Sequence, residues 1–306
     1  MPVQAVLIAG PTASGKSSVG LELAARLGGT VINADSMQVY RELRVLTARP
    51  SQSEEARAPH RLYGTIPAAE SCSVGRWLDD VADALAEARG EGRLPILVGG
   101  TGLYFKALSE GLAPVPDIPA EVRSYWREEA AKASREALHQ ELAARDPAMA
   151  ARLTLADPQR IVRALEVIHA TGISLAEWQG GNAAPWLSPS EVLPLVIAPE
   201  REPLYAAIDA RFDRMIENGA IEEVRELLDL KLDPGLPAMR AHGVRELESY
   251  LSGAVNREDA VAKAKTESRR YAKRQMTWLR RFMSDWQWFP NAAVAIEAAS
   301  ELLTTR

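Results

Sequence analysis

Short, mainly apolar runs alternate with amphipathic stretches along the N-terminal third of the chain. Residues 3–9, 30–33 and 96–98 are runs with the length and composition of strands that are buried on both faces of a sheet. Residues 18–27 and 74–88 instead repeat apolar side chains every three or four positions, which is typical of helices that bury one face. A strand, a helix and a second strand in this order predict a βαβ unit and a parallel sheet.

The apolar pattern changes beyond the third of these runs. Residues 111–119 are rich in proline and predict a connector, and residues 120–178 have helical spacing without a strand candidate. The apolar run 192–197 predicts one more strand of the parallel sheet, and helical spacing returns after it. The chain therefore carries a helical insertion between two parts of one core.

The segment from Gly10 to Ser17 reads G-P-T-A-S-G-K-S and directly follows the first apolar run. It fits G-x-x-x-x-G-K-[ST] between a strand and a helix, where backbone N–H groups and the helix N-terminus surround a phosphate group. Lys16 would neutralise a diphosphate and the Ser17 hydroxyl would bind Mg²⁺. A glycine-rich turn that binds nothing is the alternative. The predicted diphosphate-binding residues are Gly10, Pro11, Thr12, Ala13, Ser14, Gly15, Lys16 and Ser17, with Ser17 as the metal ligand.

Together these patterns predict an α/β fold, with a P-loop NTPase-like core whose parallel sheet is flanked by helices, plus an inserted all-helical domain. The expected core comprises residues 1–113 and 190–306, including C-terminal helices. The expected helical insertion comprises residues 114–189.

Two polar residues follow predicted strands at positions that suit a reaction centre. Asp35 follows the second strand, and Thr101 lies in the sequence Gly-Gly-Thr-Gly after the third. Ligands of doubly wound sheets bind outside the carboxyl ends of the strands, so both should meet the phosphate loop in one crevice. Asp35 could accept a proton from a nucleophile there, or could simply cap a helix. Thr101 could hydrogen-bond a ligand, although a plain tight turn explains its neighbouring glycines equally well.

Composition narrows the class of protein. The chain has 306 residues and a formal net charge of −5, which argues against a protein that coats nucleic acid indiscriminately. Cys72 is its one cysteine, so an internal disulfide and a multi-cysteine zinc site are excluded, and the four histidines are not spaced as metal ligands. No apolar run approaches the ~20 residues of a bilayer span. We expect a cytoplasmic protein without a signal peptide or a membrane segment.

A strongly basic segment lies near the C-terminus. Residues 263–281 contain eight lysines and arginines against Glu267 alone, which gives a net charge of +7. On a helix Arg270 and Arg274 share one face, whereas aromatic residues from Tyr271 to Phe282 share another and are expected in the core. A solvated cationic face is the common explanation of such a segment. In a chain of net charge −5, however, the segment suggests contact with a phosphate-rich polymer.

Two further groups are weaker candidates. Asp157 and Pro158 mark a helix start, with Asp157 as the N-cap, but this does not explain Arg160 and Arg163 on one face of the helix that follows. These arginines could contact phosphates or bases. Arg211 and its neighbours Asp213 and Arg214 could reach a leaving group or merely pair at the surface, and their spacing does not decide between these roles.

With these segments assembled, the chain closely resembles the tRNA dimethylallyltransferase family over nearly its whole length. The first motif is generic to phosphate-loop proteins, but the set in this order is specific. The residues that carry the resemblance are those of the phosphate loop, Asp35-Ser-Met-Gln-Val-Tyr40, Thr47-Ala-Arg-Pro50, Gly99-Gly-Thr-Gly-Leu-Tyr-Phe-Lys-Ala-Leu108, Asp157-Pro-Gln-Arg-Ile-Val-Arg163 and Lys273-Arg-Gln-Met-Thr-Trp-Leu-Arg280.

The resemblance implies a reaction and catalytic roles. The loop would hold dimethylallyl diphosphate with Mg²⁺, and the five-carbon group would pass to N6 of adenosine 37 in tRNAs that read codons beginning with U. Asp35 would orient and deprotonate the amine, Thr101 would position the substrate, and Arg211 would help neutralise the departing diphosphate. The base must leave its stack to reach the pocket.

The resemblance also implies contacts with the tRNA anticodon stem-loop by what we expect to be a monomer. The implied tRNA-binding residues are Asp35, Ser36, Met37, Gln38, Thr101, Arg123, Gln159, Arg160, Ile161, Val162, Arg163, Arg240, Arg245, Lys273, Arg274, Gln275 and Arg280.

Two other functions compete with this interpretation. A P-loop small-molecule kinase would place ATP in the loop and use Asp35 to deprotonate an alcohol, but it gives the helical insertion and the basic segment no purpose. A nucleic-acid-binding module without catalysis explains the basic segment but leaves Lys16 and Asp35 without a role.

Overall fold

The computed structural model describes residues 3–181 and 184–304. Its centre is a six-stranded sheet in the order β3-β2-β4-β1-β5-β6, and every neighbouring pair of strands is parallel. The α/β fold class predicted from the sequence is therefore confirmed. The strands are β1 (Ala5–Ala9), β2 (Thr30–Asn33), β3 (His60–Arg61), β4 (Pro95–Gly99), β5 (Val192–Ile197) and β6 (Gln287–Phe289).

The central strand β1 shows why the sheet forms from these runs. Its residues pair in register with both neighbours, Leu7 lying opposite Leu97 of β4 and Pro194 of β5. All five residues of β1 are buried, because helices cover both faces of the sheet. A strand buried on both sides needs a continuous apolar run rather than an alternating one.

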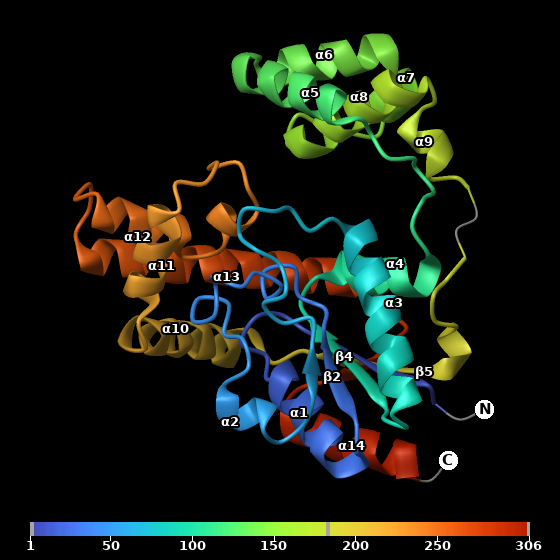
Figure 1. The fold of residues 1–306 in the computed structure, drawn as a ribbon, viewed down its shortest axis with the longest axis vertical. Helices are drawn as coiled ribbons and strands as arrows, with labels where there is room; N and C mark the ends of the chain where they lie inside the picture. The colour runs from blue at the N-terminus through green and yellow to red at the C-terminus, as the bar shows by residue number, and fades with distance from the viewer. Residues whose placement is uncertain (1–2, 182–183, 305–306) are drawn as a thin grey trace. The chain divides into compact units, whose positions relative to one another are not determined.

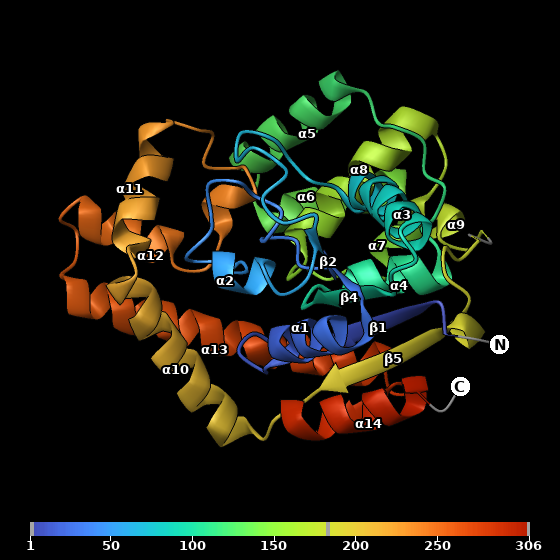
Figure 2. The same ribbon diagram turned by 60° about the horizontal axis from the view of Figure 1, so that its bottom comes forward.

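Helices form one layer on each face of the sheet (Figures 1 and 2). On one face α1 (Lys16–Leu27) and α14 (Ala292–Thr304) pack over the side chains of alternate strand residues, such as Val6 and Ile8. On the other face α3 (Val74–Gly90) and α4 (Gly102–Glu110) pack over the intervening residues, such as Leu7. The alternation of side chains along each strand therefore supplies two separate cores.

Four further helices pack together beside the sheet: α10 (Arg201–Glu217), α11 (Ala220–Asp229), α12 (Val244–Leu251) and the long helix α13 (Arg257–Phe282) (Figure 1). They share a third core with the segment that follows β2, including Val39, Tyr40 and Leu43. This core attaches the loop after β2 to the C-terminal helices. The short elements of the same unit are the helix α2 (Gln52–Glu55) and the 3₁₀ turns η1 (Pro189–Glu191) and η2 (Ala238–Arg240).

The chain divides into two compact units, one of Met1–Ser109 with Trp186–Arg306 and the other of Glu110–Pro185. In its described residues the second unit consists of helices and loops, with its own core around Trp126, Leu142 and Ile161. Asp146 organises the centre of this unit, because its carboxylate accepts hydrogen bonds from the Met149 N–H at 3.0 Å and from the Ser174 hydroxyl at 2.8 Å. The helices are α5 (Ala120–Lys132), α6 (Arg135–Arg145), α7 (Pro147–Ala150), α8 (Pro158–Thr171) and α9 (Leu175–Trp178).

Three details differ from the sequence-based expectations. The edge strands β3 and β6 were not predicted, because two and three residues are too short to show a period. Asp157 holds the N-cap position of α8, but its side chain makes no cap hydrogen bond. Phe282 is 38% exposed rather than part of the core, and the cations of Lys106 and Arg281 lie over its ring. Among the described residues, no helix is both long and apolar enough to span a bilayer.

Candidate active site at the carboxyl ends of the strands

The phosphate loop runs from the end of β1 to the first residue of α1. Gly15 has φ 90° and Ala13 has φ 61°, so the backbone turns back sharply before the helix. A side chain at Gly10 would place its Cβ 2.6 Å from the Ser14 hydroxyl and 2.7 Å from the Ile197 carbonyl oxygen, which only glycine avoids. The N-terminus of α1 has no side-chain cap, so its first N–H groups remain available for an anion.

Lys16 occupies the interior of this loop. Its side chain is buried, and Nζ donates a hydrogen bond to the Pro11 carbonyl oxygen at 3.2 Å. Burial lowers the pKa of Lys16 to about 8, the neighbouring Asp35 opposes this shift, and Arg211 adds to it. The loop therefore holds an ammonium group that an incoming diphosphate would stabilise in its charged form.

Asp35 is fixed by a short network at the end of β2. The buried side chain of Asn33 accepts the Asp35 N–H at 2.8 Å and donates to the Asp35 and Leu62 carbonyl oxygens at 3.0 Å. Asp35 Oδ1 accepts a hydrogen bond from the Met37 N–H at 3.0 Å. The residues after Asp35 form a turn and not a helix, so this bond closes a turn and does not cap a helix. The helix-cap alternative is wrong, and the carboxylate is left with acceptor capacity on Oδ2.

Thr101 holds the turn after Asp35 in place. Its hydroxyl oxygen accepts the Ser36 N–H at 2.9 Å and lies 3.2 Å from the Ser36 hydroxyl. Thr101 is thus joined to the segment that carries the carboxylate, as expected from the carboxyl ends of adjacent strands. It is not among the residues that line the cavity described next.

A cavity that is open to solvent lies at these strand ends. Phosphate-loop residues, the segment after β2 and side chains from the C-terminal helices surround it. Its lining residues are Thr12, Lys16, Ser17, Asp35, Met37, Gln38, Leu46, Thr47, Ile208, Arg211, Phe212, Met215, Ala241, His242, Ser268 and Tyr271. Lys16 and Asp35 therefore face the same space.

Arg211 is the member of its cluster that reaches the cavity. It projects from α10, and its Nη2 donates to the Thr47 carbonyl oxygen at 3.4 Å. Burial lowers its pKa, and the charge of Asp35 acts in the opposite direction. Asp213 instead pairs with Lys265 at 2.6 Å, and Arg214 is exposed. The helix thus presents one arginine to the site and the other to solvent.

The cavity wall formed by residues 38–50 is held by hydrogen bonds to its backbone. The Gln38 amide donates to the Thr47 and Ala48 carbonyl oxygens at 2.8 and 3.0 Å. The carboxylate of Glu223 on α11 accepts three successive backbone N–H groups, from Arg44 at 2.5 Å, Val45 at 2.6 Å and Leu46 at 2.8 Å. One carboxylate therefore anchors the loop that carries Leu46 and Thr47.

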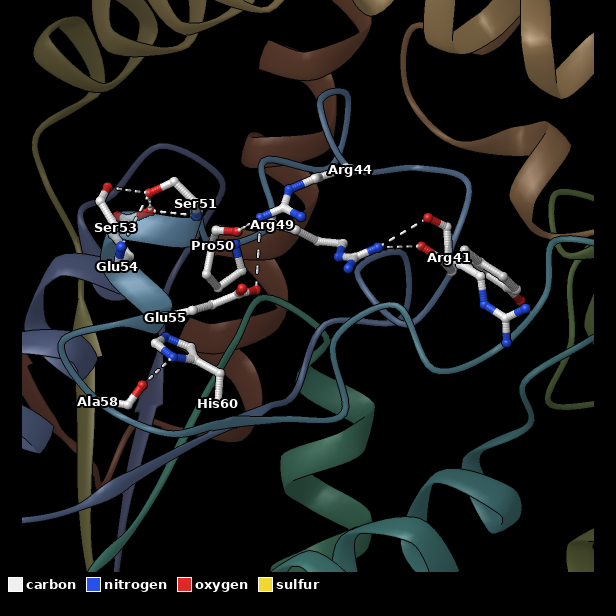
Figure 3. A network of polar contacts seen from close by, with 11 residues as sticks. Arg41, Arg44, Arg49, Pro50, Ser51, Ser53, Glu54, Glu55, Ala58 and His60 are labelled. Atoms are coloured by element: carbon white, nitrogen blue, oxygen red, sulfur yellow. Dashed lines mark hydrogen bonds and ion pairs between the residues drawn. The ribbon is translucent and has the colours of Figure 1, made fainter.

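Figure 3 shows the polar network on the outer part of the same loop. The Arg49 guanidinium points to the chain at Tyr40 and Arg41, whose carbonyl oxygens accept its Nη1 at 3.3 and 3.1 Å. Arg44 donates to the Pro50 carbonyl oxygen at 2.9 Å. The segment after β2 therefore carries its own cross-links in addition to Glu223.

Replacing Glu223 by glutamine should lower the free energy of unfolding by about 2 kcal/mol, because an amide offers one acceptor oxygen to three N–H groups and turns its own N–H₂ toward them. Chemical denaturation of the purified variant measures this. The matched change Glu222→Gln affects a neighbouring side chain that is 61% exposed and 3.9 Å from Arg225. It should alter stability by less than about 0.5 kcal/mol. Equal stabilities of the two variants would contradict the anchoring role.

The remaining predicted tRNA contacts are distributed over both units, and their roles stay predictions. Arg240, Arg245, Lys273, Arg274 and Arg280 are exposed, whereas Gln275 is buried. In the helical unit Gln159 and Arg160 are exposed, Arg123, Val162 and Arg163 are partly exposed, and Ile161 is buried in the core. Arg163 also lies 3.2 Å from Glu166.

Sequence reasoning missed three polar cavity residues, Ser268, Tyr271 and His242. The His242 and Tyr271 rings are in contact, with centroids 4.4 Å apart. Burial raises the pKa of Tyr271. Burial lowers the pKa of His242, and the charge of Arg274 lowers it further. Both are thus kept uncharged near neutral pH, and they give the cavity an aromatic wall. No motif marks these residues, because they enter the site through the packing of η2, α12 and α13.

The donor set around the loop fits Mg²⁺. Ser17, which follows Lys16, and Asp35 both line the cavity, so a hydroxyl-bearing and a carboxylate-bearing residue belong to the same wall. No group of three His, Cys, Asp or Glu side chains that could hold a metal occurs in residues 3–181 and 184–304. Mg²⁺ commonly takes one or two protein oxygens and completes its shell with substrate phosphates and water, so the few hard donors present suffice.

The parallel sheet, the glycine-rich loop at the end of β1 and the lysine inside that loop define a P-loop-type α/β protein. A family model described as "IPP transferase" matches residues 38–282, and one described as "Isopentenyl transferase" matches residues 3–66. The chain belongs to the IPP transferase family.

Curated relatives and solved structures agree with this assignment. A protein of Rhodopseudomonas palustris strain BisA53 named "tRNA dimethylallyltransferase" is 57% identical over 93% of this chain and 87% of its own length. A protein of the same name from Bradyrhizobium strain BTAi1 is 56% identical over 93% of both chains. The crystal structure of a tRNA isopentenylpyrophosphate transferase from Bacillus halodurans aligns with a TM-score of 0.67 at 34% identity, over 98% of both chains. A eukaryotic dimethylallyltransferase described as acting on tRNA aligns with a TM-score of 0.80 at 26% identity, over 95% of this chain and 74% of its own.

Proposed function

We propose that this protein transfers the dimethylallyl group of dimethylallyl diphosphate to N6 of adenosine 37 in tRNAs that read codons beginning with U. The products are N6-isopentenyladenosine in the anticodon loop and diphosphate. The observation that carries this proposal is the convergence of Lys16, Asp35 and Arg211 on one cavity of an IPP transferase fold. A cationic cradle and a carboxylate on one cavity suit a reaction in which a diphosphate leaves while an amine attacks.

The proposed step forms one bond and breaks one. The lone pair of adenine N6 attacks the allylic carbon, and the bond between that carbon and the diphosphate oxygen breaks, its electron pair leaving with the diphosphate. The proton lost from N6 passes to the Asp35 carboxylate, whose Oδ2 has acceptor capacity. An exocyclic amine conjugated with a purine is a weak nucleophile, so orientation by this carboxylate matters as much as its basicity.

The departing diphosphate requires positive charge within the same cavity. Lys16 and the N–H groups at the start of α1 would bind the diphosphate, and Arg211 would contribute the second positive charge. Ser17 would hold Mg²⁺ here, and the ion would supply further charge neutralisation when bound. Lys16 has one hydrogen bond, to Pro11, and an ammonium group has two further N–H donors to offer a phosphate.

The RNA would bring its base to this cavity from the outside. The amine of adenosine 37 is inaccessible while the base is stacked, so the base must be extruded into the pocket, where the His242 and Tyr271 rings offer an aromatic wall. Exposed cations on α13 would bind phosphates of the anticodon stem-loop, and a monomer would suffice for this contact.

The kinase alternative is not favoured, because the similar curated proteins are tRNA dimethylallyltransferases over nearly their full length. A direct test is to incubate the purified protein with labelled dimethylallyl diphosphate and unmodified tRNA, and to identify the modified nucleosides by mass. We expect the label on N6 of adenosine 37. An ATP-dependent phosphorylated product without prenylated tRNA would overturn the proposal.

A further inference from the structure

Gln275 is a buried polar residue in the middle of the basic helix α13. Its side chain is 6% exposed, although Lys273 and Arg274 beside it are exposed. Its amide oxygen accepts the backbone N–H of Thr12 at 2.9 Å, and its amide nitrogen donates to the Gly100 carbonyl oxygen at 2.9 Å. A backbone N–H can only donate and a carbonyl can only accept, so these partners fix the orientation of the amide.

The two groups that this amide joins belong to the reaction centre. Thr12 lies in the phosphate loop and lines the cavity. Gly100 follows β4, and a Cβ built on it would lie 3.4 Å from Asp35 Oδ2 and 2.3 Å from Gln275 Nε2. The Gln275 amide therefore sits where the loop after β1, the loop after β4 and the Asp35 carboxylate come together.

These contacts give Gln275 a different task from that of its exposed neighbours. The amide hydrogen bonds to backbone groups of both loops, and its buried position leaves little surface for an RNA. The Thr12 N–H donates to Gln275 in this structure, so the position of the loop entry depends on this hydrogen bond. Loops at functional sites need such support from rigid elements, because small displacements of binding groups cost much of the binding.

We infer that Gln275 is a positioning residue for the diphosphate site: it fixes the entry of the phosphate loop against the loop that follows β4, and it does not bind the tRNA. This rests on the proposed function, since it assigns the loop a diphosphate. It replaces the tRNA contact that the family resemblance implies at this position with a structural role in the other substrate's site.

The test compares Gln275→Met with the matched change Lys273→Gln on the same helix. Methionine has a similar length but leaves the Thr12 N–H and the Gly100 carbonyl without partners, so the loop should relax. We expect the affinity for inorganic diphosphate with Mg²⁺, measured by titration calorimetry, to fall about tenfold or more, while the dissociation constant for tRNA changes less than about twofold. Lys273→Gln should instead weaken tRNA binding and leave the affinity for diphosphate unchanged.

A second variant covers the case in which Gln275→Met does not fold. Gly100→Ala places a methyl group 2.3 Å from Gln275 Nε2 and should displace the amide, with the same selective loss of diphosphate affinity. In transfer assays both variants should raise KM for dimethylallyl diphosphate and leave KM for tRNA unchanged.

The outcomes separate this inference from the proposed function. The positioning role would be overturned if the variants bind diphosphate with the affinity of the unaltered protein, or if their affinity for tRNA falls instead. Either result would leave the proposed reaction intact. An unaltered protein that binds no diphosphate would overturn both.

Discussion

Replacing Asp35 by asparagine should lower the rate of dimethylallyl transfer by about a thousandfold while tRNA binding changes less than about threefold. Asparagine has the same shape and can still accept the Met37 N–H through its side-chain oxygen, so the turn after β2 should persist. What it loses is the negative charge and the capacity to take a proton, and general bases contribute about 10²- to 10⁴-fold. Single-turnover kinetics at saturating diphosphate and tRNA measure the chemical step directly.

The control for this variant is Asp213→Asn on α10. Asp213 pairs with Lys265 at 2.6 Å, and its side chain is 53% exposed, so its loss removes a carboxylate outside the cavity. Its transfer rate should stay within about twofold of the unaltered protein. An Asp35→Asn protein with nearly full activity would mean that another group accepts the N6 proton.

The parts of the fold that the sequence predicted are those set by local pattern. The phosphate loop is contiguous, and its flanking strand and helix have unmistakable apolar periods. The convergence of Asp35 with Lys16 followed from a general rule, since carboxyl ends of parallel strands share one edge of a sheet. A local motif and a topological rule were therefore sufficient to find the centre of the site.

The rest of the cavity wall depends on tertiary packing, which no single sequence displays. His242 follows η2 and Tyr271 lies within the basic helix, and neither is close in sequence to the loop that it faces. Tertiary packing also decides that Arg211 and not Arg214 reaches the cavity. The core against which α10 packs sets the rotation of this helix about its axis. Gln275 shows the converse, an inward-facing residue in a segment whose composition indicates a surface.

Charge within the cavity links the two reaction partners. The Asp35 carboxylate opposes the lowering of the pKa values of both Lys16 and Arg211 by burial. The carboxylate that we propose as the acceptor of the N6 proton therefore also favours the charged forms of Lys16 and Arg211. A bound diphosphate would add its own negative charge to this effect and would leave Asp35 to the amine.

Replacing Lys16 by methionine should raise KM for dimethylallyl diphosphate about a hundredfold or more and also lower kcat, because the ammonium group faces a charge that grows as the allylic bond breaks. Methionine fills the buried space with a flexible apolar chain of similar length, so the loop should remain folded. Steady-state transfer assays with each substrate varied in turn measure the effect. KM for tRNA should be unchanged, since Lys16 lies inside the loop and not on the exposed face of α13.

The comparison that isolates this effect is Lys132→Met in the helical unit, which removes the same charge from a side chain that is 67% exposed and 3.3 Å from Glu129. Net charge changes equally in the two variants, so any general electrostatic effect on RNA binding should be common to both. A loss of diphosphate affinity confined to Lys16→Met would assign the effect to the loop. Equal KM values for dimethylallyl diphosphate in the two variants would mean that the loop does not bind the leaving group, because a buried cation beside a bound diphosphate cannot be removed without a loss of affinity.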